Sequence, residues 1–314
     1  MEIIKDLQWH KGITATELLA AYSSTGYQST LLSKAADTVI KMKKNGAKIY
    51  LTFTSNMVTS GLRGFFAQLI KLGIPDILVT TVGAVEEDIM RAFGEKFIVG
   101  SFDPDDMELY ERGCNRVGNI YITNESYCRF EDFMAPTLQK LYDKQKRWPV
   151  SEMLAEIGLE LKDENSILFQ AAKQKIPLFC PAITDGAFGF HLFMFQQKHP
   201  DFIVDVVKDF SNILFVTSQD DKKGIIALGG GVSKHHAIFA GLLNGGMDYA
   251  IYMTTSHQSS GSMSGATTKE AKSWGKVKDE SDVVTVMGDV TITFPLMMCA
   301  VLDRLTEEGL LPDA

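Results

Sequence analysis

The sequence predicts a doubly wound α/β fold with a mostly parallel sheet, formed as one large domain over residues 1–314. Two observations support this prediction. Short runs rich in β-branched residues are continuously apolar rather than alternating, which is typical of parallel strands covered on both faces. The segments between these runs carry apolar residues at helical spacing, so strands and helices are expected to alternate along the chain.

The strands are expected in seven apolar runs, which cover residues 47–55, 76–83, 176–183, 212–218, 224–230, 248–255 and 282–289. Two of the intervening helices are expected at 61–73 and 235–246, where apolar stripes end in glycine. Residues 102–134 form a less regular excursion. Two helices are expected after it, at 135–147 and 149–161, with Ser151 as the N-cap of the second.

The amino-acid composition and net charge exclude some classes of function. The chain has 314 residues, a 45% apolar fraction and a net charge of -8. An acidic chain argues against a nucleic-acid partner and suits cationic ligands. The four cysteines form no CxxC pair, and we expect reduced, buried thiols. The N-terminus shows no apolar signal-peptide core and no apolar run reaches membrane-spanning length, so we expect a cytoplasmic protein without a membrane partner.

In a doubly wound sheet, ligands bind beyond the carboxyl ends of the strands. Five hydroxyl or amide side chains lie at the end of the strand expected at 47–55 and just after it, at Thr54, Ser55, Asn56, Thr59 and Ser60. Such groups at a helix start form an anion site, although plain helix capping is the alternative.

A second strand end stops at Gly83 and is followed by Glu86, Glu87 and Asp88. One of these carboxylates could bind a ribose hydroxyl or an ammonium group. The alternative is that acidic residues near a helix start only complement the helix dipole.

Two more strand ends carry ionisable residues. Asp185 precedes a glycine, which indicates either a ligand contact or an Asp-Gly turn. Residues 229–231 are three glycines, which allow a ligand to approach the backbone closely. His235 follows at a helix start, where a neutral imidazole is favoured and could act as a base, or else the ring merely caps or packs. No metal site is predicted, because no carboxylate or cysteine stands at ligand spacing from these histidines.

The last strand ends lie at residues 254–277 and 286–295. The first opens into a long Ser/Gly/Thr loop that leads to Trp274 and Lys276, and the second contains Asp289. A loop of that length in a compact domain is typical of a binding loop. Together the strand ends predict a nucleotide-like cofactor beside a cationic ligand, and a lysine of lowered pKa is the natural catalyst of imine chemistry.

In these motifs the chain resembles the deoxyhypusine synthase family. The resemblance runs from about residue 12 to residue 302 through "TSNMVTSG", "TTVGAVEED", "TDG", "LGGGVSKHH", "EAKSWGK" and "GDVTITFPL". It implies a Rossmann-like, NAD-binding enzyme that is a homotetramer with active sites at a dimer interface. In that family, oxidation of spermidine gives an imine, an enzyme lysine captures the aminobutyl group, and the group passes to a lysine of translation initiation factor 5A.

The resemblance also implies roles for individual residues. The imine-forming lysine falls on Lys276 and the base on His235, while Lys272 is expected to be solvated. The NAD contacts fall on Ser55, Asn56, Thr59, Thr81, Gly83, Glu87, Asp185, Gly230, Thr255, Ser256, Asp289 and Val290. The amine site falls on Glu86, Glu87, His235, Gly261, Ser262, Glu270 and Trp274, and includes the altered positions Phe190 and Met263.

Those altered positions depart from the family pattern. Phe190, Met263 and Ser260 stand where the family has acidic residues. Each lost charge-assisted hydrogen bond would weaken ammonium binding by about 1.5–3 kcal/mol. The prediction from sequence is therefore an NAD-dependent aminoalkyl transferase with a remodelled amine site. The alternatives are a true deoxyhypusine synthase, a homospermidine synthase-like enzyme with a small-amine acceptor, and a silent NAD-binding partner subunit.

Overall fold

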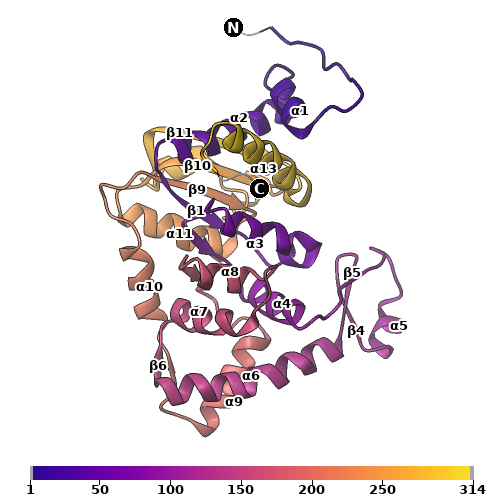
Figure 1. Ribbon diagram of the computed structural model, residues 1–314, viewed down its shortest axis with the longest axis vertical. Coiled ribbons are helices and arrows are strands. Elements are labelled where there is room, and N and C mark those ends of the chain that lie inside the picture. The colour runs from indigo at the N-terminus through magenta and orange to yellow at the C-terminus, as the bar shows by residue number, and fades with distance from the viewer. Residues whose placement is uncertain (1–2, 312–314) are drawn as a thin grey trace. The chain divides into compact units, whose positions relative to one another are not determined.

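The computed structural model of the protein describes residues 3–311 (Figure 1). The chain forms two compact units built from interleaved segments. Among the described residues, unit 1 contains 3–53, 72–79 and 212–311, and unit 2 contains 54–71 and 80–211. The predicted site residues are therefore divided between two folded bodies, which we describe separately.

Unit 1 is built on a parallel sheet in which five strands lie side by side in the order β11, β10, β9, β1, β2. Their bounds are Lys48–Thr52 for β1, Ile77–Val79 for β2, Lys223–Leu228 for β9, Met247–Thr254 for β10 and Val277–Met287 for β11. Leu51 pairs with both Leu78 and Ile226, and all three side chains are buried. Burial on both faces explains why the strands are continuously apolar in sequence.

Helices cover both faces of this sheet, as a doubly wound fold requires. The helices of unit 1 are α1 (Ala15–Tyr22), α2 (Tyr27–Lys44), α11 (Gly231–Leu243), α12 (Thr268–Ser273) and α13 (Val290–Glu307), with a short 3₁₀ turn η2 (Gln258–Ser260). In Figure 1, α2 and α13 lie along one side of the strands and α11 along the other. The predicted α/β fold class is confirmed.

Unit 2 is mainly helical. Its helices are η1 (Val58–Leu62), α3 (Arg63–Lys71), α4 (Val82–Ala92), α5 (Asp106–Glu111), α6 (Asn124–Lys144), α7 (Val150–Leu161), α8 (Ile167–Lys173) and α9 (Ala187–Lys198). Its short strands are β3 (Ile98–Val99), β4 (Cys114–Val117), β5 (Ile120–Thr123), β6 (Arg147–Trp148), β7 (Leu178–Phe179) and β8 (Ile203–Val204). Aromatic rings such as Phe130 and Phe188, 6.3 Å apart between centroids, fill its core.

One predicted strand is wrong. Residues 212–218 contain the end of helix α10 (Val206–Phe215) rather than a strand. The β-branched and aromatic side chains of this run continue an amphipathic helix that begins upstream, with Ile213 buried. Over so short an apolar run, periodicity alone cannot separate the two structures.

The predicted helix at 135–147 is too short, because α6 already begins at Asn124 and takes up the end of the expected excursion. Pro136 inside α6 misled the prediction, since proline usually marks a helix boundary. The N-cap of α7 is Pro149 rather than Ser151. Ser151 instead donates from its backbone N–H (2.8 Å) and its hydroxyl (2.5 Å) to Asp209. Asp209 lies on α10 and thus supplies a hydrogen-bond acceptor to the start of α7.

The cysteines are all free, but the expectation that they are buried holds only for Cys180. Cys114 is half-buried, and Cys128 and Cys299 are exposed on α6 and α13. In α13 the apolar sequence around Cys299 did not distinguish the buried face of the helix from the exposed one. Within residues 3–311, no helix combines the length and apolar character needed to cross a membrane.

Candidate active site

Lys276 owes its position to the way helix α12 ends. Gly275 adopts φ +68°, a conformation that favours glycine, directly after the C-cap residue Trp274. The N–H of Lys276 then donates to the carbonyl of Ala271 (3.1 Å), and that of Gly275 to the carbonyl of Lys272 (2.9 Å). This is a Schellman motif, and it turns the chain from α12 into β11 at Lys276.

The Lys276 side chain is 8% exposed, whereas that of Trp274 is 65% exposed. The Lys276 Nζ lies 5.1 Å from the centroid of the Trp274 ring. An amine held within about 6 Å of an indole face is favoured by a cation–π contact when it is charged. The geometry is that of a lysine withdrawn from water behind an exposed aromatic ring.

His235 follows the first turn of α11, and its ring is influenced by the charge of Lys276. Partial burial lowers the pKa of His235, and the positive charge of Lys276 lowers it further. A neutral imidazole at neutral pH can accept a proton. The adjacent His236 differs, because burial lowers its pKa to about 4 and it is packed within the fold.

Turn 262–266, which contains Met263, lies directly on the start of α11. A Cβ placed on Gly230 would lie 2.3 Å from the Cα of Ser264, so only glycine allows this close approach. Lys234 donates to the carbonyls of Met263 (3.0 Å) and Ala266 (2.8 Å). The predicted residues Gly230, Met263 and His235 are thereby brought together in unit 1.

The ends of β10 and β11 carry the remaining predicted residues of unit 1. The N–H of Gly288 donates to the carbonyl of Thr254 (3.0 Å), which joins the two strand ends. Asp289 caps α13 by accepting from the N–H of Thr291 (2.8 Å), rather than lying within a strand. Predicted residues that are exposed or half-buried beside these ends or in the Ser/Gly loop are Thr255, Ser256, Gly261 and Ser262, together with the exposed Glu270 of α12.

In unit 2, the first two acidic residues of the "EED" motif are buried on α4. The Thr59 hydroxyl donates to Glu87 (2.5 Å), and the backbone N–H of Phe188 donates to Glu86 (2.7 Å). Burial raises the pKa of Glu87 to about 7, against the opposing effect of the Thr59 hydrogen bond. Burial also raises the pKa of Glu86. For both carboxylates burial disfavours the charged form, which a nearby cation would favour.

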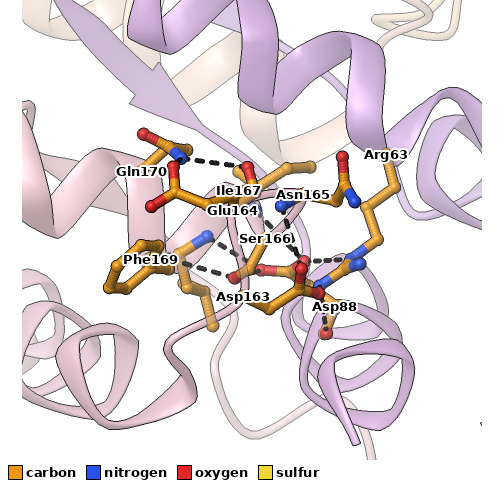
Figure 2. A network of polar contacts seen from close by, with 10 residues as sticks. Arg63, Asp88, Asp163, Glu164, Asn165, Ser166, Ile167, Phe169 and Gln170 are labelled. Carbon is orange, nitrogen blue, oxygen red and sulfur yellow. Dashed lines mark hydrogen bonds and ion pairs between the residues drawn. The ribbon is translucent and has the colours of Figure 1, made fainter. Parts of the chain in front are cut away.

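Asp88, the third acidic residue, has a structural role (Figure 2). Its carboxylate pairs with Arg63 (2.5 Å), which also reaches Asp163 (2.7 Å). It further accepts hydrogen bonds from the hydroxyl of Ser166 and from the backbone of residues 167 and 168, at the start of α8. Asp88 therefore ties α3, α4 and α8 together and has no capacity left for a ligand.

The other predicted residues of unit 2 lie around α4 and the "TDG" turn. The N–H of Ser55 donates to the Thr81 hydroxyl (3.1 Å), and a Cβ on Gly83 would lie 2.9 Å from that of Ser55. Asn56 and Asp185 are exposed. The charge of Asp185 adds to the rise in the pKa of Glu86, which places the "TDG" turn beside that carboxylate.

Phe190 follows on α9 and is 58% exposed. Its ring neighbours those of His191 and Phe193, with centroids 5.9 and 6.4 Å away. It lines a cavity of about 230 Å³ that α9 shares with residues of α6.

Two further residues, one in each unit, were not identified from the sequence. Tyr127 of α6 is half-buried, and its pKa is raised by burial and by the charges of Glu86 and Glu87. Lys234 directly precedes the predicted base His235 and is fully buried. Nothing in the sequence around Tyr127 indicates a functional residue. The position of Lys234 next to the predicted base His235 is a feature by which it could have been identified.

Comparison with known proteins identifies the family. A family model described as deoxyhypusine synthase matches residues 17–301. The "Probable deoxyhypusine synthase" of Thermoplasma volcanium is 37% identical over 301 residues, which cover 95% of this chain and 97% of that protein. The "Deoxyhypusine synthase" of Senecio vernalis is 35% identical and covers 99% of this chain and 92% of its own.

A solved structure agrees with these relatives. The crystal structure of a "putative deoxyhypusine synthase" from Entamoeba histolytica superposes with a TM-score of 0.69 at 28% identity, covering 96% of this chain and 97% of that one. Sequence and fold thus match over almost the entire length. The chain belongs to the deoxyhypusine synthase family, a family of transferases in the polyamine and hypusine pathway.

Proposed function

We propose that the chain is a deoxyhypusine synthase, which transfers the aminobutyl group of spermidine to a lysine of a translation factor 5A-type protein through an imine on Lys276. The observation that carries the proposal is the buried amine of Lys276, 5.1 Å from the Trp274 ring and close enough to His235 to lower its pKa. The relatives that share this chain's length carry the same name. We place the reaction in the cytoplasm, where a translation factor is available.

The residues present fit NAD as the cofactor. Helix α11 begins at the glycine run 229–231 without a side-chain cap, and Gly229 and Gly231 have φ of +79° and +68°. Free backbone N–H groups at such a start suit a pyrophosphate. The resemblance to the family also points to the "TSN" and "TTVG" segments of unit 2 as contacts of the dinucleotide. When bound, NAD supplies the two-electron oxidation of the amine to an imine and the final return of the hydride.

Lys276 and His235 carry the transfer step. The Lys276 nitrogen forms a bond to the imine carbon of the oxidised substrate, and the bond from that carbon to the leaving diamine breaks. The neutral His235 ring takes the proton that Lys276 loses on attack and returns it to the departing amine. The acceptor lysine then displaces Lys276 by the same exchange.

Carboxylates provide the attraction for a polyamine. Glu86 and Glu87 in unit 2 and Glu270 in unit 1 are the acidic residues that the family motifs point to. Because burial raises the pKa of Glu86 and Glu87, an approaching ammonium would favour their ionised forms. We further propose a homotetramer, as in the family.

A second candidate keeps the chemistry and changes the amine. Phe190 and Met263 put apolar side chains at positions where the family motifs carry carboxylates, and Phe190 is largely exposed. An exposed ring can return part of the lost attraction by a cation–π contact of about 0.5–1 kcal/mol. Such an enzyme would use a different polyamine, or pass the group to a small amine as a homospermidine synthase-like enzyme does.

The test is covalent trapping. The protein is incubated with NAD and one amine at a time, reduced with borohydride, and mapped by mass spectrometry. We expect an aminobutyl label on Lys276 with spermidine, and Lys272, whose amine donates to the carbonyl of Asp279, serves as the internal control. Chase with a translation factor 5A-type protein should transfer the group. If the protein binds NAD but no amine labels it, the silent-subunit alternative replaces the enzyme.

The second candidate is tested by restoring the acids. The double variant Phe190→Asp/Met263→Asp is compared with the native chain for spermidine and for shorter and longer polyamines. A gain in spermidine labelling would show that these two positions set the amine preference. Unchanged labelling across all the amines would leave the standard deoxyhypusine synthase activity as the conclusion.

A further inference from the structure

Lys234 is a buried lysine for which the proposed chemistry has no direct use. Its side chain is 0% exposed, although lysine is almost never fully buried without a partner. It also lies on the first turn of α11, where the helix dipole disfavours a positive charge. None of the ion pairs found between residues 3 and 311 includes it.

The contacts of Lys234 converge on one short segment. Its amine donates to the carbonyls of Met263 (3.0 Å) and Ala266 (2.8 Å) and lies 3.8 Å from the centroid of the Tyr252 ring. Both carbonyls belong to turn 262–266, which is itself closed by hydrogen bonds from Gly265 and Ala266 to the carbonyl of Ser262 (3.1 and 3.2 Å). The ammonium therefore holds the two ends of one turn, and the aromatic ring of β10 lies against it.

Turn 262–266 leads directly into α12, the helix that precedes Lys276. Thr267, the next residue, caps α12 by accepting from the N–H of Glu270 (3.3 Å). Helix α12 then ends in the motif that places Lys276. Any displacement of the turn would thus move Met263 and the start of α12 relative to His235, which follows Lys234 on α11.

We propose that Lys234 is a positioning residue that clamps turn 262–266 to the first turn of α11 and so sets how tightly the amine substrate is held beside Lys276. This role rests on the proposed transferase function. Lys234 does not form the imine itself, since its amine is buried and donates to two carbonyls. It acts through the turn that it holds.

Lys223 provides a matched control. It is also 0% exposed in unit 1, and its amine also donates to two carbonyls, those of Ser218 (2.8 Å) and Asp221 (2.6 Å). It lies at the first residue of β9, whereas α11 and Lys234 follow the last residue of that strand. Loss of either amine removes two buried charged hydrogen bonds, but only Lys234 holds the predicted amine site.

The experiment compares Lys234→Met with Lys223→Met in the full-length protein. Both should lower the melting temperature. We expect Lys234→Met to raise the KM for the amine about tenfold or more while kcat changes less than about threefold, and Lys223→Met to leave both within about twofold. Lys234→Gln, whose amide can still donate, should recover part of the affinity and serves if the methionine variant does not fold.

Hydrogen exchange gives a second readout that does not depend on activity. The amides of residues 262–266 should exchange faster in Lys234→Met and at the native rate in Lys223→Met. Equal exchange in both variants would overturn the clamp, as would an amine KM that stays native in Lys234→Met. Loss of Lys276 labelling at every amine concentration, with native exchange in the turn, would instead make Lys234 part of the chemistry and also overturn the proposal. If the native chain takes no label at all, the transferase function fails, while the exchange data still decide the clamp.

Discussion

The carboxylate cluster of unit 2 and the lysine cluster of unit 1 show the same physical effect with opposite signs. Burial raises the pKa of Glu87 to about 7 and lowers that of Lys234 to about 8. In both cases the low-dielectric surroundings disfavour the charged form and bring titration close to neutral pH. One unit therefore holds acids, and the other bases, that a small change in surroundings can charge or discharge.

The two clusters differ in how the charge is compensated. In unit 2 the adjacent Asp88 is matched by Arg63 and by donors from α8, so a fully paired charge stands next to two underpaired ones. In unit 1 the lysines are stabilised by backbone carbonyls and by the rings of Tyr252 and Trp274. A buried charge with several direct partners, such as that of Asp88 or Lys234, indicates a structural role. A buried group with fewer partners, such as Glu87 or Lys276, is instead a candidate for contact with a ligand or for a reaction.

The sharpest test of the unit 1 cluster is Lys276→Arg. Arginine keeps the positive charge and the contact with Trp274 but cannot form an imine, so we expect turnover to fall by at least about 10³-fold. Transfer of label from spermidine to a translation factor 5A-type protein measures the turnover. Lys272→Arg on α12, the helix that precedes Lys276, is the control and should retain activity. Residual turnover above a few per cent in Lys276→Arg would remove this lysine from the mechanism.

The next largest effect should come from the paired charge in unit 2. Asp88→Ala leaves Arg63 buried without its main partner and removes acceptors at the start of α8, so we expect a loss of about 3–5 kcal/mol in the free energy of unfolding. Chemical denaturation measures it. Asp106→Ala, which breaks the exposed pair with Arg116, is the control and should change little. Equal effects in the two variants would contradict an architectural role for Asp88.

Glu87→Gln tests the underpaired carboxylate through pH. Because the pKa of Glu87 is raised from 4.5 to about 7, the folded protein binds a proton there that the unfolded chain has released between these values. Native stability must therefore fall as pH rises from about 4.5 to 7. The variant lacks this loss, so its stability relative to the native chain should increase by up to ~3 kcal/mol between pH 4.5 and pH 8.

Denaturation midpoints at pH 4.5 and pH 8 supply that comparison, with the exposed Glu111→Gln as control. Parallel pH dependence in the native chain and in Glu87→Gln would show that the carboxylate is not held out of its normal range. Such a result would also weaken the contrast with Asp88.

The smallest effect is expected for Trp274→Leu. The ring is largely exposed, and a cation–π contact at an exposed site contributes about 0.5–1 kcal/mol, so labelling of Lys276 should slow by only about two- to fivefold. Stopped-time trapping measures the rate. Trp148→Leu is unsuitable as a control because that indole is buried, and Tyr110→Leu on the exposed helix α5 serves instead. A loss as large as that of Lys276→Arg would make the ring essential for chemistry.

Much of this protein follows from its sequence alone. Continuous apolar runs determine buried parallel strands, and the alternation with amphipathic stretches determines the α/β class, because these patterns depend only on which faces are covered. The motif residues can also be identified from the sequence. The "GGG" run, the "EED" triplet and "SWGK" are each a distinctive group of residues that follows a predicted strand or helix. The sequence did not determine every helix and strand. The apolar run 212–218 suits a strand as well as a helix, and Pro136 lies inside a helix although proline usually marks a helix boundary.

Only the tertiary structure separated residues that look alike in sequence. Glu87 and Asp88 are adjacent acids, yet one is underpaired and the other is held by Arg63 and α8, because successive positions of a helix face different neighbours. Lys234 lies in the "LGGGVSKHH" motif, and Lys272 and Lys276 lie in "EAKSWGK". The burial and partners of these three lysines depend on where turn 262–266 and α12 lie. Residue type and order determined the family and the chemistry available, whereas the contacts between distant segments decided which charges are paired and which are left to react.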